Sequence, residues 1–178
     1  MTTQYKNLSS YNEDEMPDKK KVFTQQYAIV VADWNPQVTQ SLLQGTYDAL
    51  IENGANPDLI TIIHVPGAFE LIFAAKQFMD EYSEIDNIKV HKYAAIIALG
   101  CVIQGETPHF AYVCQGVTYG IATLNANSNG CPVIFGILTT QNLQQALDRA
   151  GGLHGNKGFE AGITAIKMAN IDWHTSIF

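Results

Sequence analysis

The stretch GCVIQGETPHFAYVC, residues 100–114, places a single histidine, His109, among residues that could hold an anion. It follows YAAIIALG, an apolar run typical of a buried strand. Gly105, Glu106 and Thr107 come just before a helical pattern, and the free backbone N–H groups at a helix start favour an anion. Because histidine ordinarily titrates near ~6.5, it can accept and donate a proton close to neutral pH. The pattern favours proton transfer by His109 over its alternative, a solvated or capping histidine.

Two further segments follow predicted strands and carry candidate binding residues. ADWNP presents Trp34, which could stack on a flat heterocycle or simply cover a helix start that Asn35 caps. VPGAFEL presents open backbone amides around Ala68 and Phe69, with Glu70 just inside the next helix. Glu70 could accept hydrogen bonds from a polyol, or it could only complement the helix dipole. Both alternatives stay open from the residues alone.

The choice of cations is uneven. The ten basic residues comprise nine lysines and one arginine, Arg149, which precedes the segment HGNKG with Lys157. A guanidinium group binds phosphate in a bidentate geometry that an ammonium group cannot match. Arg149 is therefore a candidate phosphate ligand, and an ordinary cation at a helix end is the alternative.

Composition excludes several other classes of function. The formal net charge of −7 argues against nucleic acid or an anionic membrane surface as the main partner. The three cysteines form no C-x-x-C pair, so we expect free thiols in a reducing cytosol, and the N-terminus has no apolar signal segment. The histidines are too scattered for a metal site, and nothing visible would activate Cys101 or Cys114 as a nucleophile.

Apolar strands alternate with amphipathic helices along the chain. The strands are predicted at residues 27–33, 59–65, 93–100 and 131–138, and the helices begin near residues 36, 68, 109, 142 and 157. Strands that are apolar throughout are typical of a parallel sheet covered on both faces. We therefore expect an α/β fold, a three-layer αβα sandwich around a four-stranded parallel sheet (flavodoxin-like). Ligands bind such folds beyond the carboxyl ends of the strands. Strand three ends in Gly100 rather than in aspartate, which excludes a receiver domain.

The first residues differ in composition from the rest. Residues 1–22 are polar and mixed in charge, so we expect a flexible N-terminal arm there and a single domain over residues 23–178. No apolar run is long enough to cross a membrane.

Four motifs together resemble one family. VPGAFEL, GCVIQGETPHFAYVC, PVIFGILTT and DRAGGLHGNKG, in this order and spacing, are similar to those of 6,7-dimethyl-8-ribityllumazine synthases, and the resemblance covers residues 24–170. It implies a transferase of riboflavin biosynthesis that needs no cofactor or metal. Such an enzyme condenses 5-amino-6-(D-ribitylamino)uracil with 3,4-dihydroxy-2-butanone 4-phosphate and releases phosphate and water.

The resemblance also implies a role for each candidate residue. His109 matches the proton-transfer histidine, and Arg149, with the Glu106–Thr107 backbone, matches the phosphate site. The other implied substrate-binding residues are Trp34, Asn35, Ala68, Phe69, Glu70, Cys101, Val102, Ile103, Phe135 and Lys157. Gln104, Ala111 and Ile72 depart from the residues most common in the family. Gln104 removes a charge beside the phosphate loop.

The resemblance finally implies an assembly. The pocket of the family lies between neighbouring subunits of a pentamer, with Phe135 and Arg149 contributed by the second chain, and pentamers can form a 60-subunit icosahedral shell. The implied setting is cytoplasmic, with the product passed to riboflavin synthase. Two alternatives are a relative that binds flavin or lumazine without turnover, and a shell protein whose assembly matters more than its chemistry.

Overall fold

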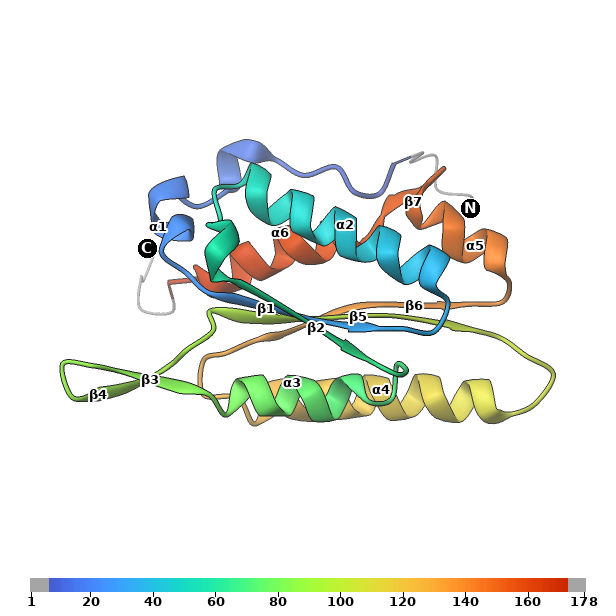
Figure 1. Ribbon diagram of the computed structural model, residues 1–178. Coiled ribbons are helices and arrows are strands. Elements are labelled where there is room, and N and C mark those ends of the chain that lie inside the picture. Colours follow the sequence, from blue (N-terminus) through green and yellow to red (C-terminus); the bar gives the residue numbers. More distant parts are fainter. Residues whose placement is uncertain (1–6, 173–178) are drawn as a thin grey trace, which may run out of the picture.

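The computed structural model describes residues 7–172 and contains the predicted α/β sandwich. Four parallel strands form the central sheet in the order β2-β1-β5-β6, and their bounds are β1 Tyr27–Ala32, β2 Ile60–Val65, β5 Ala95–Ile103 and β6 Val133–Thr140. Helices α2 (Pro36–Glu52), α5 (Leu143–Asp148) and α6 (Lys157–Ala169) cover one face, and α3 (Leu71–Met79) and α4 (His109–Ala126) cover the other (Figure 1). The prediction of a three-layer flavodoxin-like sandwich is confirmed.

The apolar runs form central strands because both faces of the sheet are covered. Every residue of β1 is buried. Tyr27, Ile29 and Val31 pack with the side chains of α2, α5 and α6. The alternate residues Ala28, Val30 and Ala32 pack with those of α3 and α4. A strand that is buried on both faces cannot show the hydrophobic–polar alternation of a half-exposed strand, and this explains its uniform sequence.

Most helix ends follow the expected signals. The side chain of Asn142 accepts a hydrogen bond from the Gln145 amide and so caps α5. The side chain of Asn156 accepts from the amides of Gly158 and Phe159 and caps α6. Gly54, just after α2, has a φ of +96°, a conformation that glycine adopts without strain.

Other element boundaries differ from those predicted. Strand β5 continues three residues beyond Gly100 to Ile103, so the loop before α4 is shorter than predicted, whereas α4 begins at His109 as predicted. Helix α5 ends at Asp148, and Gly151–Gly152 belong to a small antiparallel ribbon of β7 (Ala150–Gly152) and β8 (Gly155–Asn156). Arg149 therefore lies at the C-terminal cap of α5 and not within a helix.

A β-hairpin lies outside the central sheet and was not predicted. Strands β3 (Tyr82–Ile85) and β4 (Ile88–His91) pair antiparallel and extend away from the sandwich (Figure 1). Its two turn residues, Asp86 and Asn87, both have positive φ, as a type I′ turn requires. This hairpin occupies the connection between α3 and β5.

The N-terminal segment lies against the domain in its described part. It contains a 3₁₀ turn η1 (Glu13–Glu15) and a short helix α1 (Lys19–Phe23), in which Val22 is fully buried in the core. Residues 1–6 of the predicted arm lie outside the described residues. The division into an arm and a domain at residue 22 stays a prediction. Among residues 7–172, no helix is long and apolar enough to cross a bilayer.

Glycines let α6 approach α2 closely. A Cβ atom added at Gly158 would lie 1.9 Å from the carbonyl oxygen of Leu42 on α2. The buried hydroxyl of Thr46 lies 2.9 Å from that carbonyl oxygen and 2.8 Å from the carbonyl oxygen of Gly158. The start of α6, which carries Lys157, is thereby fixed against α2.

We expect Gly158→Ala to destabilise the protein by about 1–3 kcal/mol, because the methyl group would overpack a backbone-to-backbone contact. By helix propensity alone, alanine would stabilise α6 by up to about 1 kcal/mol relative to glycine. A net loss of stability would therefore report the steric clash. Equilibrium unfolding in urea measures the difference. Gly105→Ala is the matched control, because a Cβ there meets no atom within 4 Å. Equal stability of the two variants would contradict the close packing of α2 and α6.

Candidate active site

A pocket of about 580 Å³ opens at the carboxyl ends of β1 and β5, beside α3 and α4. It is where the fold predicts a ligand site, because the loops that leave these parallel strands meet at one edge of the sheet. Ten of the predicted site residues line it, namely Trp34, Asn35, Ala68, Phe69, Glu70, Cys101, Val102, Ile103, Thr107 and His109. Gly67, Gly105, Phe110, Tyr112 and Val113 complete the lining.

Asn35 joins two of the loops, though not as the expected helix cap. Its side chain makes no capping hydrogen bond, and its Nδ2 donates instead to the carbonyl oxygen of Cys101 at 3.0 Å. Its backbone is left-handed, with φ 61° and ψ 54°, and asparagine tolerates this conformation better than most residues. Asn35 does occupy the N-cap position of α2, but its side chain does not cap the helix, because the left-handed turn directs the amide towards β5 rather than towards the amides of α2.

The loop after β2 brings a carboxylate and an indole ring together. A Cβ added at Gly67 would lie 3.0 Å from Oε2 of Glu70 and 3.7 Å from Cε3 of Trp34, so both side chains meet over this glycine. The Trp34 side chain is 69% exposed, which leaves a ring face free for a flat ligand. Glu70 makes no capping hydrogen bond to α3, so its carboxylate remains free to accept from a ligand.

The loop after β5 ends in the open N-terminus of α4. No side chain caps this 18-residue helix, so its first N–H groups remain available to an anion. His109, the first residue of the helix, lines the pocket, and its ring has no hydrogen-bond partner among residues 7–172. Thr107 also lines the pocket, whereas the exposed Glu106 does not.

The cysteine thiols stay protonated at neutral pH. Burial raises the pKa of Cys101 to about 11 and that of Cys131 to about 12. Burial also raises the pKa of Cys114. A neutral thiol is a poor nucleophile, so Cys101 contributes shape and a carbonyl oxygen to the pocket rather than covalent chemistry. No group of His, Cys, Asp and Glu within residues 7–172 is arranged to hold a metal ion.

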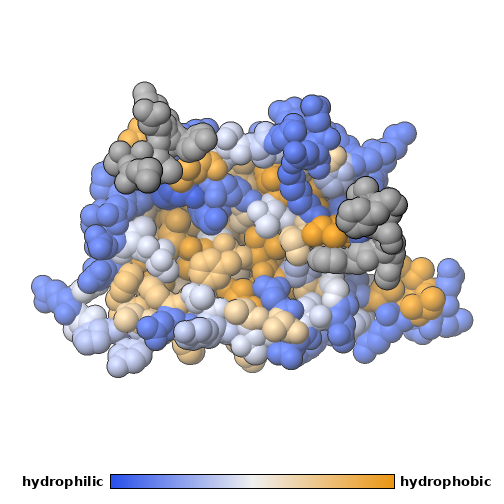
Figure 2. All heavy atoms as spheres, turned by 180° about the vertical axis from the view of Figure 1, so that it is seen from behind, coloured by the Kyte–Doolittle hydropathy of each residue, from blue (hydrophilic) through white to orange (hydrophobic). Residues whose placement is uncertain are grey.

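Three predicted site residues lie elsewhere. Phe135 and Lys157 line a second hollow, of about 660 Å³, along the free edge of β6 and the adjoining side of α6. Arg149 lines neither hollow. Seen from behind, where β6, α4 and α6 are nearest, apolar side chains gather across the middle of the surface (Figure 2). The predicted site residues thus form two groups, here called the two partial sites, on different parts of the surface.

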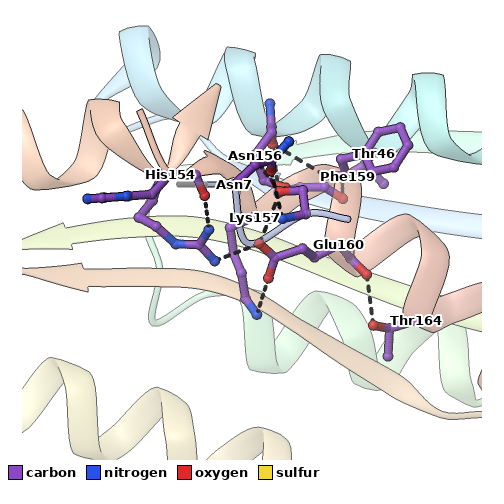
Figure 3. A network of polar contacts seen from close by, with 11 residues as sticks. Asn7, Thr46, His154, Asn156, Lys157, Phe159, Glu160 and Thr164 are labelled. Carbon is purple, nitrogen blue, oxygen red and sulfur yellow. Dashed lines mark hydrogen bonds and ion pairs between the residues drawn. The ribbon is translucent and has the colours of Figure 1, made fainter. Parts of the chain in front are cut away.

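Arg149 and Lys157 converge on one carboxylate, that of Glu160 (Figure 3). The guanidinium Nη2 of Arg149 lies 2.7 Å from Oε1, and Nζ of Lys157 lies 3.1 Å from Oε2. Nη1 of Arg149 also donates to the carbonyl oxygen of His154 at 2.6 Å. Because the side chains of Arg149 and Glu160 are both only 19% exposed, this pair is screened less than a surface ion pair. One carboxylate cannot neutralise two cations, so the group retains a positive charge for an anion.

Sequence reasoning missed Glu160 and the aromatic wall of the pocket. The spacing of Lys157 and Glu160, three residues apart on a helix, was a usable signal for an ion pair. Tyr112 stands three residues after His109 and therefore shares its helix face. The contact between Arg149 and Glu160 across β7 and β8 had no signal in the sequence.

Comparison with known proteins agrees with this geometry. Residues 24–172 match the family of 6,7-dimethyl-8-ribityllumazine synthase. The chain belongs to this family. Proteins of that name from Porphyromonas gingivalis and Bacteroides fragilis are similar to it. The first is 47% identical over 172 residues, 97% of this chain and 99% of its own length. The second is 51% identical over 147 residues, 83% of this chain and 96% of its own length. The family resemblance is therefore confirmed.

We expect iodoacetamide at about pH 8 to leave Cys101 unmodified in the folded protein. With a pKa of about 11, on the order of one Cys101 thiol in a thousand is ionised at that pH, and the thiolate is the reacting form. Peptide mass spectrometry measures the modification. Protein unfolded in guanidinium chloride is the control, in which Cys101, Cys114 and Cys131 should all react. Rapid labelling of Cys101 in the folded state would contradict its protected, neutral state.

Proposed function

We propose that the chain catalyses the condensation of 5-amino-6-(D-ribitylamino)uracil with 3,4-dihydroxy-2-butanone 4-phosphate to 6,7-dimethyl-8-ribityllumazine, in riboflavin biosynthesis. The observation that carries the proposal is family membership over residues 24–172, together with His109 in a pocket of matching character. The reaction joins an amine to a ketone as an imine and releases water. Phosphate then leaves, and ring closure releases water again.

We assign the proton transfers to His109. Imine formation, phosphate elimination and ring closure each move protons between nitrogen, carbon and oxygen atoms, so a group that can both accept and donate is required. The partner-free ring of His109 at the pocket wall supports this role. No cofactor is needed, since every step is proton transfer, addition or elimination.

The pyrimidine and its ribityl chain fit the side of the pocket built by the first two loops. The exposed ring of Trp34 supports stacking on the pyrimidine. Glu70 offers carboxylate oxygens to the ribityl hydroxyls, beside the backbone of Ala68 and Phe69. The C-terminal end of β5, Cys101–Ile103, forms the floor of the pocket. The hydrogen bond from Asn35 to the carbonyl oxygen of Cys101 fixes the loop after β1 against this floor.

We propose that the phosphate lies at the N-terminus of α4, near the backbone of Glu106 and Thr107, and meets Arg149 and Lys157 of a neighbouring subunit. The two partial sites support this arrangement, because His109 lines one of them and Phe135 and Lys157 line the other. A guanidinium from outside would supply the charge that Gln104 in this loop does not.

A pentamer, free or built into a 60-subunit shell, would bring the two partial sites together through a ring of identical contacts. Exposed aromatic side chains on α3 and α4, Phe73 (70%), Tyr112 (72%) and Tyr119 (70%), support an interface there. We further propose a cytoplasmic enzyme whose product passes to riboflavin synthase.

Mixing the purified protein with both substrates tests the function directly. Lumazine absorbance and fluorescence should rise well above the spontaneous reaction. His109→Ala should lower kcat by about 10²–10⁴-fold, the usual contribution of a positioned proton carrier. His91→Ala, in the remote hairpin, is the matched control and should keep full activity. Tight binding of lumazine without turnover would favour the non-catalytic alternative.

Coexpression of His109→Ala with Arg149→Gln tests the shared pocket. Each variant alone should be nearly inactive, but in mixed assemblies one neighbour can supply His109 and the other Arg149. Random mixing should restore roughly one quarter of the wild-type activity, since each of the two halves is intact with even odds. The double variant in one chain, coexpressed with itself, is the control. No recovery in the mixed assemblies would contradict a pocket shared between subunits.

A further inference from the structure

The N-terminal segment is seated against the elements that carry Arg149 and Lys157. The amide of Leu8 donates to the carbonyl oxygen of His154, between β7 and β8, at 3.3 Å. The rings of Tyr11 and Phe159, on α6, lie with centroids 5.8 Å apart. Residues 8–11 therefore cross the start of α6 beside the Glu160 group.

Ser9 is the residue of this segment that reaches Glu160. Its hydroxyl oxygen accepts a hydrogen bond from the amide of Asn156 at 2.7 Å. The same hydroxyl lies 3.1 Å from Oε1 of Glu160 and 3.1 Å from the carbonyl oxygen of Asn156, and its single hydrogen can satisfy either acceptor. Oε1 of Glu160 is the atom that also accepts from Arg149.

Gly155 provides the space for this contact. Its φ is +81°, and a Cβ added there would lie 2.4 Å from the hydroxyl oxygen of Ser9 and 2.4 Å from Oδ1 of Asn7. Any other residue at this position would displace the segment as well as strain the backbone. The position of Ser9 therefore depends on a glycine at the first residue of β8.

We propose that Ser9 is a positioning residue for the phosphate site, acting through Glu160 on Arg149. This inference rests on the proposed function. Glu160 must hold the guanidinium in one direction and yet leave it free to donate to a phosphate. The Ser9 hydroxyl lies 3.1 Å from Oε1, the oxygen that Arg149 also contacts, and so restrains the rotation of the carboxylate when an anion competes for Arg149. The segment before the domain thereby sets the affinity for the phosphorylated substrate.

Steady-state kinetics of Ser9→Ala test the proposal. We expect the KM for the butanone phosphate to rise about fivefold, the equivalent of one hydrogen bond, with kcat and the KM for the pyrimidine unchanged. Ser9→Thr keeps the hydroxyl and should restore the KM. Ser10→Ala, at the exposed neighbouring position, is the matched control and should behave as wild type. An unchanged KM in Ser9→Ala would overturn the proposal.

A double-mutant cycle separates positioning from general destabilisation. In a Glu160→Ala background, Ser9→Ala should have no further effect on the KM, because the carboxylate that Ser9 holds has been removed. An equal fivefold rise in both backgrounds would show that Ser9 acts by another route and would overturn the proposal.

Inorganic phosphate distinguishes this proposal from the proposed function. Titration of wild type and Ser9→Ala with inorganic phosphate, followed by calorimetry, should show weaker binding by the variant even if neither protein turns over the substrates. Absence of turnover in the wild type with this difference intact would refute only the proposed reaction. Turnover with equal phosphate binding by both proteins would refute only the role of Ser9.

Discussion

The parallel register of β1 with β2 and β5 is the constraint on which the pocket depends. Tyr27 to Ala32 pair in step with Ile60 to Val65, and Tyr27 to Val31 pair in step with Ala95 to Leu99, so these strands end at the same edge. The loops that leave them therefore emerge together, and Asn35, just after β1, donates to the carbonyl oxygen of Cys101 on the neighbouring strand β5. A slip of one residue would turn the apolar set of β1 towards the wrong helices, and the burial of both faces excludes it.

The two partial sites differ in charge. The pocket with His109 is largely apolar with one free carboxylate, Glu70, whereas the Arg149 group concentrates two cations around Glu160. Keeping Glu160 between the cations prevents their mutual repulsion in the unliganded protein and leaves one net positive charge to offer. The position of this group at the base of α6 depends on the glycine contact with α2.

The sequence predicted the sandwich well because each of its signals is local. Apolar runs and the helical spacing of apolar residues report on their own neighbours in the chain. The hairpin was missed although Asp86-Asn87 is a recognisable turn signal, because its strands are short, mix polar with apolar residues and are largely exposed. The last three residues of β5, Cys101–Ile103, were not predicted as strand, because the prediction ended the strand at Gly100. In the structure Gly100 lies within β5 and leaves space for the side chains of Leu71 and Ala68.

The candidate site residues likewise include some that were predictable from the sequence and some that were not. Members of the three loops around β1, β2 and β5 were predictable, because the topology of a parallel sheet requires them to meet. The direction of the Asn35 amide and the partner of Arg149 were not, since both depend on contacts between residues far apart in sequence. The position of Phe135 and Lys157 was not predictable either. They line the hollow beside β6 and α6, and His109 does not line it. The chemistry that a residue can perform follows from its type, but its place on the folded surface depends on packing between segments far apart in sequence, which no local pattern reports.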